Sequence, residues 1–438
     1  MNTKKYFTTI TLIILLAAGK QTYAQTDTVT LDGAINAALQ NNRMLKIKTM
    51  QVQQGEEKVK ENEIKKYPSF LLNSTYLYNV NTSDPLPVSS TTGIPLPIDD
   101  KYLQLGEHNI FNAAAVIYQP ITEQGKIHTA INISKTDVLI SEKEQKKVEQ
   151  QVRQSVERLY YGSLINQKQK EEGTSKLEAA KIKLFDVESA LLAGKTVNVD
   201  KAGLQANIAD AEQTILQLDI QAHDYMDDLK QITGLTADNL FLANVDTTAN
   251  AIPVLEESKS AAFVNNVDMN IANLNSTKAE LGIKAARQSY LPDVGFVGGY
   301  VYQRGNSVVP NNNPFAGINF KWNIQDVLSN RHVVKQRKIQ SQQATENLAN
   351  TREQLNTDVD KTYNKIIQSK NLIAVAQKAV NFRKEALKIQ LDKDDAGLNT
   401  KVDILNAQSS LAKSQADLYA AELSYRLAVS ELNILEGQ

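Results

Sequence analysis

Residues 31–78 decide the fold, and they read LDGAINAALQNNRMLKIKTMQVQQGEEKVKENEIKKYPSFLLNSTYLY. This stretch aligns without a gap on residues 255–302, which read LEESKSAAFVNNVDMNIANLNSTKAELGIKAARQSYLPDVGFVGGYVY. The matched pairs include Leu31 with Leu255, Asn41-Asn42 with Asn265-Asn266, Pro68 with Pro292, Tyr76 with Tyr300 and Tyr78 with Tyr302.

A second register covers the later part of each half. It places Val156 on Val359, Ala193-Gly194 on Ala396-Gly397, and Val199-Asp200 on Val402-Asp403. A fixed-period self-similarity indicates a repeat architecture. We therefore divide the chain into a first repeat at 25–234, a linker at 235–254 and a second repeat at 255–438.

The first residues predict export from the cytoplasm. Lys4 and Lys5 precede an apolar run from Phe7 to Ala18, which is too short to span a bilayer as a helix. The run is followed by small residues, so residues 1–24 are expected to be a signal peptide that is cleaved after Ala24. The alternative, a retained anchor helix, fits the length of the apolar run less well.

Composition excludes several classes of function. Removing residues 1–24 removes three lysines and no acids, and 45 basic residues then face 49 acidic ones. Such a balance excludes a strong general attraction to nucleic acid. The absence of cysteine excludes disulfides, thiolate metal sites and cysteine nucleophiles. No later stretch has 18 consecutive apolar residues, so no transmembrane helix is expected.

Each half is predicted to run helix, strand, loop, strand, long helix, tight turn and helix. The first helix, over 31–66, should stop at Pro68, and its counterpart at Pro292, because a proline disfavours helix in the residue before it. Strands are predicted at about 70–79, 109–119, 294–303 and 315–323, with a long loop at 81–108. Their alternation of apolar and polar residues fits a membrane barrel wall or a soluble hairpin equally well.

The long helices favour the membrane interpretation. Residues 123–192 contain no proline, and they carry a narrow apolar seam of Val148, Val152, Val156 and Leu159. The same spacing recurs in the second repeat at Leu355, Val359, Tyr363 and Ile366. At 1.5 Å per residue this helix would reach roughly 105 Å, about the summed length of helices 31–66 and 198–233. The chain should therefore be a long helical column with strands at one end and tight turns at the other.

Four strands cannot close a barrel, and in lipid every strand edge must be paired. The missing strands must then come from other copies of the chain. Because eight strands leave an interior filled by side chains, a trimer with twelve strands is the smallest assembly with a useful pore.

Taken together, the signal peptide, tandem halves, strand pairs, long helices and glycine turns resemble the TolC-like outer membrane efflux family. The likeness covers nearly the whole mature chain, and it rests on the repeat arrangement rather than on one short motif. It implies a mixed, mainly α fold: a tandem-repeat coiled-coil tunnel in the periplasm, with four β-strands per chain contributing to a trimeric 12-stranded outer-membrane β-barrel.

The resemblance also implies a function and partners. The protein would be the exit duct of a tripartite efflux or type I secretion system, in the cell outer membrane. It would conduct substrates passively from an inner-membrane pump through a periplasmic adaptor, in contact with outer-membrane lipid and without nucleic acid or cofactor. The cargo and the type of pump are not specified by the sequence.

Two stretches resemble the family's helix-tip motif, where the adaptor docks. They are Ala193, Gly194, Lys195 and Thr196 in the first repeat, and Ala396, Gly397, Leu398, Asn399 and Thr400 in the second. Their glycines permit the positive φ of a tight helix-to-helix turn. The family's aperture aspartate would fall on Asp403, with Asp200 in the matching place. The simpler role for both is an acid in a helix's first turn.

The tip motif departs from the family pattern at three positions. Asn406 replaces a second aspartate, and Asn399 and Asp394 replace the arginine and tyrosine that close the tunnel. The closing contacts of the family are therefore not expected in the same form.

Few residues suggest catalysis. The four histidines (His108, His128, His223 and His332) lack metal-ligand spacing, and no phosphate loop or catalytic triad can be built. Tyr76, Tyr78, Tyr300, Tyr302 and Trp322 are better explained as anchors at the membrane interface. The competing interpretations are a periplasmic adaptor and a secreted structural coiled coil, and an enzyme is less favoured than either.

Overall fold

The computed structural model describes residues 28–81, 108–192, 198–235, 241–243, 254–305, 310–398 and 400–438. The predicted signal peptide, nearly all of the loop at 81–108, most of the linker, residues 193–197 and Asn399 lie outside these ranges. The side chain of Asp200 lies outside them as well.

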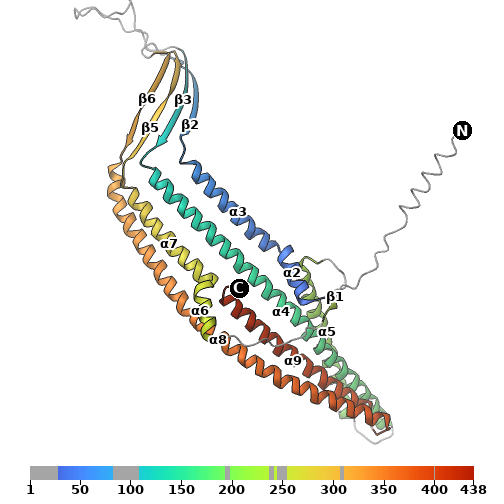
Figure 1. Ribbon diagram of the computed structural model, residues 1–438. Helices are drawn as coiled ribbons and strands as arrows, with labels where there is room; N and C mark the ends of the chain where they lie inside the picture. The colour runs from blue at the N-terminus through green and yellow to red at the C-terminus, as the bar shows by residue number, and fades with distance from the viewer. Residues whose placement is uncertain are drawn as a thin grey trace, which may run out of the picture. The chain divides into compact units, whose positions relative to one another are not determined.

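Helices and strands follow the predicted order in both repeats (Figure 1). The first repeat contains β1 (Thr28–Val29), α2 (Leu31–Asn41), α3 (Arg43–Ile64), β2 (Ser69–Tyr78), β3 (Asn109–Pro120), α4 (Gln124–Leu192) and α5 (Asn198–Thr233). The rest of the chain contains β4 (Phe241–Leu242), α6 (Leu255–Asn265), α7 (Val267–Gln288), β5 (Asp293–Arg304), β6 (Asn312–Lys321), α8 (Ile324–Asp395) and α9 (Lys401–Leu435).

The helix predicted over 31–66 is in fact two helices, and the prediction of one helix was wrong. Asn42 separates α2 from α3 with non-helical dihedrals of φ −59° and ψ 126°. In the second repeat Asn266 separates α6 from α7, and its side chain accepts from the Met269 amide at 2.9 Å. Asparagine favours such positions because its side chain replaces a backbone partner at a helix start.

The chain divides into two compact units that do not coincide with the repeats. One unit comprises residues 44–148, 256–359 and 434–438, and the other comprises the remaining described residues. Both long helices cross from one unit to the other, so each unit contains parts of both repeats.

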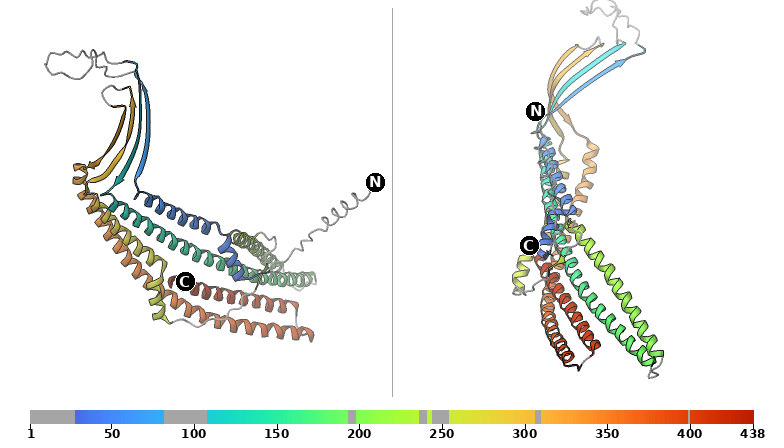
Figure 2. Two further views of the ribbon diagram at one scale, coloured as in Figure 1. Left: turned by 45° about the horizontal axis from the view of Figure 1, so that its top comes forward. Right: turned by 90° about the vertical axis from the view of Figure 1, so that its right-hand side faces the viewer.

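The first unit contains an antiparallel sheet of four strands in the order β2-β3-β5-β6 (Figures 1 and 2). β3 pairs with β5, which joins the two repeats, and β2 and β6 are the edges. In the same unit α3 lies along the first part of α4, where Asn62 Nδ2 donates to Ser134 Oγ at 2.7 Å.

The second unit contains two helical hairpins, one made by α4 with α5 and the other by α8 with α9 (Figure 2). Lys181 and Glu212 pair across the first at 3.0 Å, and Ser369 and Ser424 hydroxyls meet across the second at 3.0 Å. The predicted seam is largely buried, with Val156 and Ile366 fully covered. Small residues on α9 allow close packing of the helices there: Ser409, Ala412, Ala416 and Ala428.

A short parallel pair, β1 with β4, also belongs to this second unit. The Tyr160 hydroxyl of α4 lies 2.9 Å from the Val29 carbonyl oxygen and 2.7 Å from that of Ala243, and donates to them. Burial raises the pKa of Tyr160 to about 12, so the hydroxyl keeps its proton and remains a donor.

Candidate functional site

One face of the sheet is mainly apolar, with polar residues such as Arg304 and Asn109 at the end far from the helices. The strand register places alternate residues on this face, and they include Phe70, Leu72, Phe296, Ile318 and Phe320. Their side chains are 56 to 70 % exposed, and no described element covers them. A contiguous exposed apolar surface of this kind marks contact with lipid or protein. An ordinary soluble hairpin, which buries one face, does not fit.

Aromatic side chains lie along this apolar face. Tyr76, at the end of β2 far from the helices, donates to Asn109 Oδ1 at 2.6 Å, and Tyr300, which the register places at the level of Leu72, donates to Asn312 Oδ1 at 2.7 Å. The Phe111 and Tyr302 ring centroids are 6.1 Å apart. Phe70, Phe296 and Phe320 lie nearer the helices, and Trp322 follows the end of β6.

The length of β2 is close to the thickness of a membrane's apolar layer. Phe70 and Tyr78 are eight residues apart on β2, which spans about 26 Å in an extended strand. Outer-membrane strands carry an apolar band of about 25 Å between aromatic girdles. Of the tyrosines singled out from the sequence, Tyr76 and Tyr78 lie at the end of β2 far from the helices, and Tyr300 and Tyr302 lie nearer the middle of the sheet.

The opposite face of the sheet is more polar, although it also carries apolar side chains such as Leu71, Leu77 and Phe315. Its amide side chains are Asn73, Asn112, Gln303, Asn313 and Asn319. Its charged residues on the described strands are Asp293 and Lys321, which are cross-strand neighbours at the end nearest the helices. Lys126 of α4 pairs with Asp293 at 2.7 Å. A polar face opposite an apolar one suits a wall between lipid and water.

Hydrogen bonds fix the helices to the sheet. Thr122 Oγ1 donates to the Pro292 carbonyl at 2.7 Å and accepts from the Val294 amide at 2.8 Å. Pro68 lies between the end of α3 and the start of β2, and Pro292 lies between α7 and β5. The two prolines therefore stand where helix changes to strand in each repeat.

At the far end of the second repeat, α8 ends in a glycine turn. Gly397 has φ +68°, and its amide donates to the Asp394 carbonyl at 2.8 Å. The Leu398 amide donates to the Lys393 carbonyl at 2.9 Å, which completes a Schellman motif. Leu398 itself is 80 % exposed. The glycine supplies the left-handed conformation because it has no Cβ.

Thr400 and Asp403 cap the start of α9. The Thr400 hydroxyl donates to Asp403 Oδ2 at 2.6 Å, and the Thr400 amide lies 3.3 Å from the same oxygen. The Asp403 amide donates back to Thr400 Oγ1 at 3.3 Å, as in a capping box. Side-chain and backbone hydrogen bonds from Thr400 lower the pKa of Asp403. Asp403 is thus an exposed, ionised carboxylate that is held in place at the tip.

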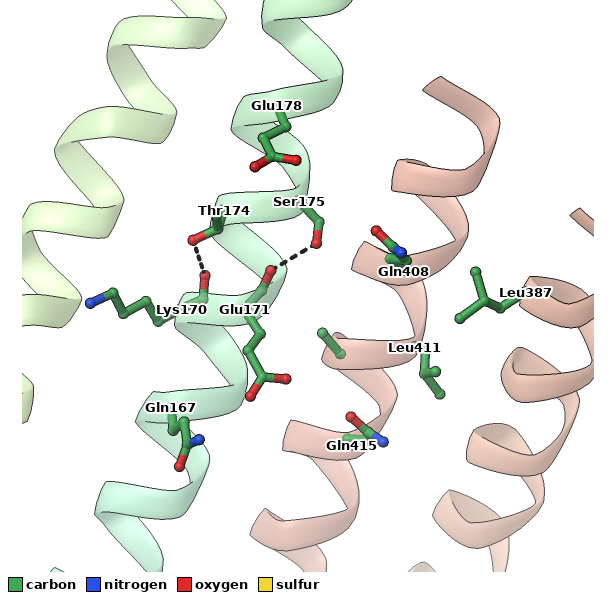
Figure 3. Close-up of a pocket in the computed structure, with 11 residues that line it drawn as sticks. Gln167, Lys170, Glu171, Thr174, Ser175, Glu178, Leu387, Gln408, Leu411 and Gln415 are labelled. Atoms are coloured by element: carbon green, nitrogen blue, oxygen red, sulfur yellow. Dashed lines mark hydrogen bonds between the residues drawn. The ribbon is translucent and has the colours of Figure 1, made fainter. Parts of the chain in front are cut away.

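A groove of about 530 Å³ lies between α4 and the α8–α9 hairpin (Figure 3). Amides line much of it, from Gln167 on α4 and from Gln408 and Gln415 on α9. Two charged residues of its α4 wall are paired, Lys170 with Asp219 on α5 and Glu171 with Lys168 on α4 itself. The groove is therefore polar.

The sequence analysis missed one cluster of charged residues. Glu157 of α4 is buried, and Arg426 of α9 lies half-buried beside it. Glu157 Oε1 and Arg426 Nε are 3.7 Å apart. The adjacent tyrosines, Tyr160 and Tyr161, could have indicated a buried position at Glu157, but not its partner on α9. Because Val156, Tyr160 and Tyr161 are all buried, two faces of α4 are covered, and Glu157 lies between these two faces.

Within the described residues, no helix is long and apolar enough to cross a membrane. In the same part of the chain, no three acidic or histidine side chains gather as metal ligands.

A protein-family model matches most of the chain. The model of the family described as outer membrane efflux protein matches residues 34–235 and 259–438. The chain belongs to this family. Searching the curated proteins found no match.

Solved structures share the fold. The Campylobacter jejuni CmeC outer membrane channel has a TM-score of 0.73 at 17% identity, covering 93% of this chain and 85% of that one. The outer membrane protein VceC of Vibrio cholerae has a TM-score of 0.69 at 15% identity, with coverage of 93% and 96%. CusC, whose structures concern folding and transmembrane channel formation, scores 0.71 at 15% identity, with coverage of 93% and 92%.

These findings decide between the interpretations left open by the sequence. This outer membrane efflux protein is mainly helical, with four strands in one membrane sheet, as predicted. It is an outer membrane protein and acts in efflux. The adaptor and structural coiled-coil interpretations are wrong, and the family is one of channels rather than enzymes.

Proposed function

We propose that three copies of this efflux protein form a passive exit duct, closed around a pore in the outer membrane and continued by a helical tunnel. The observation that carries this proposal is the membrane sheet. It has one apolar face with aromatic side chains along it, one more polar face, and two edge strands without partners in the described chain.

Such a sheet is incomplete on its own. Unpaired edge groups of β2 and β6 would face hydrocarbon, where each costs several kcal/mol. Pairing β6 of one copy with β2 of the next removes every edge once the ring closes. Three copies supply twelve strands, which is enough for a water-filled interior.

The helices support the same assembly. Leu372, Val375, Phe382 and Ile389 of α8 follow a heptad spacing and are 54 to 68 % exposed. On α5, Leu216 and Ile220 are each 64 % exposed. Apolar seams of this kind on a helical hairpin call for another helix, and neighbouring copies would supply it.

The tips of the hairpins are the proposed contact with an adaptor, and through it with an inner-membrane pump. The docking residues would be those of the turn at 396–400 and of the matching turn at 193–196. Asp403, exposed and ionised, would form a ring of three carboxylates around the threefold axis, with Asp200 in the matching place. Such a ring would bind cations and narrow the aperture.

The experiment is single-channel conductance of the purified mature protein in a planar bilayer. Wild type is compared with Asp403→Ala and with Asp210→Asn, which removes a carboxylate from the middle of α5. We expect discrete conductance steps, and weaker block by divalent cations in Asp403→Ala alone.

Each outcome decides one part of the proposal. Steps with equal block in all three proteins would keep the duct and remove Asp403 from the aperture. A folded protein that gives no steps, and no steps after the tip turns are deleted, would contradict the duct itself.

A further inference from the structure

A buried cluster of ionisable groups joins the two repeats within the unit of helical hairpins. Glu157 of α4 is 5 % exposed and Tyr161 is fully buried, and Glu422 of α9 is 7 % exposed. Arg426 and Ser430 follow Glu422 on α9 at helical spacing, and both lie against Glu157. Carboxylates are seldom buried so deeply unless their charge is compensated.

Compensation of the charge on Glu157 is incomplete. Its Oε1 lies 3.7 Å from Arg426 Nε, a long contact for an ion pair, and its Oε2 has no hydrogen-bond partner. Arg426 also lies near Tyr161, whose pKa is influenced by Arg426, Glu422 and Glu157 together. The buried Glu157 carboxyl is therefore only weakly paired at one oxygen and unpaired at the other.

The other charged and titratable groups around Glu157 do not complete the compensation of its charge. Arg153, on the preceding turn of α4, acts on it only electrostatically, and Tyr419 on α9 lies near Glu422 rather than Glu157. Burial raises the pKa of Glu157, and this outweighs the lowering by Arg426, Ser430 and Arg153. The neutral form of the carboxyl is thus favoured by its surroundings.

We propose that Glu157 is a proton-binding site, and that the bound proton tightens the contact between α4 of the first repeat and α9 of the second. The proton comes from solvent and binds Glu157 Oε2, the oxygen without a partner. Protonation makes the Glu157 carboxyl neutral, so the contact between α4 and α9 no longer buries an incompletely compensated charge. No other bond is made or broken.

The direction of the pH effect follows from linkage. A carboxyl group that binds its proton more tightly in the folded chain stabilises the fold as the pH falls. The gain begins as the pH falls through the folded pKa of Glu157 and is complete below the ordinary pKa of glutamate. The contact is therefore weaker at neutral and alkaline pH and stronger in acid.

The test is a pH titration of the full mature protein in detergent, followed by infrared difference spectroscopy of protonated carboxyl groups. Glu157→Gln mimics the protonated state, and Glu149→Gln, an exposed glutamate two turns earlier on α4, is the matched control. Wild type and Glu149→Gln should show one carboxyl that protonates at higher pH than the others. Glu157→Gln should lose that signal.

Two further readouts keep the proposal testable if Glu157→Gln folds poorly. Arg426→Gln should shift the same titration to higher pH, since the guanidinium opposes protonation. The melting temperature of Glu157→Gln, where it folds, should equal that of wild type in acid and exceed it increasingly as pH rises. A carboxyl signal unchanged by Glu157→Gln, or a variant less stable than wild type at alkaline pH, would overturn the proposal.

Discussion

Gly397 and Gly437 both have a left-handed backbone conformation, but only at Gly437 would an added Cβ also collide with a neighbouring atom. Gly397 has φ +68° and Gly437 has φ +77°, but a Cβ on Gly397 would meet nothing within 4 Å. A Cβ on Gly437 would overlap the carbonyl oxygen of Asn265. We expect Gly397→Ala to cost about 1 kcal/mol of unfolding free energy. Gly437→Ala should cost clearly more, and equal losses in thermal unfolding would refute this account of the two turns.

At the same tip, Thr400 controls the ionisation of Asp403. Because the hydrogen bonds from Thr400 lower the pKa of Asp403, the ionised carboxylate stabilises the start of α9 above its unfolded pKa. That stability is lost as pH falls through the folded pKa. Thr400→Val should move the pKa of Asp403 upward, as followed by the carboxyl carbon shift in NMR. Thr351→Val, which removes an exposed hydroxyl on α8, should leave it unchanged.

Among the elements, the junction of sheet and helices depends on one hydroxyl. Thr122→Val keeps the shape of the side chain but leaves the Pro292 carbonyl and the Val294 amide without this partner. Losing a half-buried hydrogen-bonding group costs about 1–3 kcal/mol. We expect a lower melting temperature for Thr122→Val and no change for Thr345→Val, whose hydroxyl bonds only within α8. An unchanged melting temperature in both would show that water replaces the bond.

Strands and long helices were predictable because each has its own period in the sequence. The four strands were located within three residues, since alternation and prolines mark their ends. The break at Asn42 was missed because apolar positions continue the helical period across it, although Asn41-Asn42 and Asn265-Asn266 align. β1 and β4 were missed because strands of two residues have no period of their own.

Side-chain contacts could be predicted only in part. The left-handed turn at Gly397 follows from glycine's freedom, and the structure contains it. The Glu157 cluster does not follow from the sequence, because its members belong to different repeats and meet only when α4 packs on α9. The register of such a contact depends on how the two hairpins pack, and no local pattern in the sequence specifies it.

At the scale of the whole molecule, the proposed ring of copies would satisfy two kinds of exposed surface. The edges of the sheet need strands, and the apolar seams of α5 and α8 need helices. A closed ring satisfies both at once, because each copy offers β2 to one neighbour and β6 to the other.

The most direct test of this account is the mass of the mature protein in a membrane-mimetic nanodisc, measured by native mass spectrometry. We predict one species with three chains, and a resistance to proteolysis of the sheet in that species alone. A protein that is folded and membrane-inserted but consists of a single chain would contradict the account, because its strand edges would then be satisfied without partners.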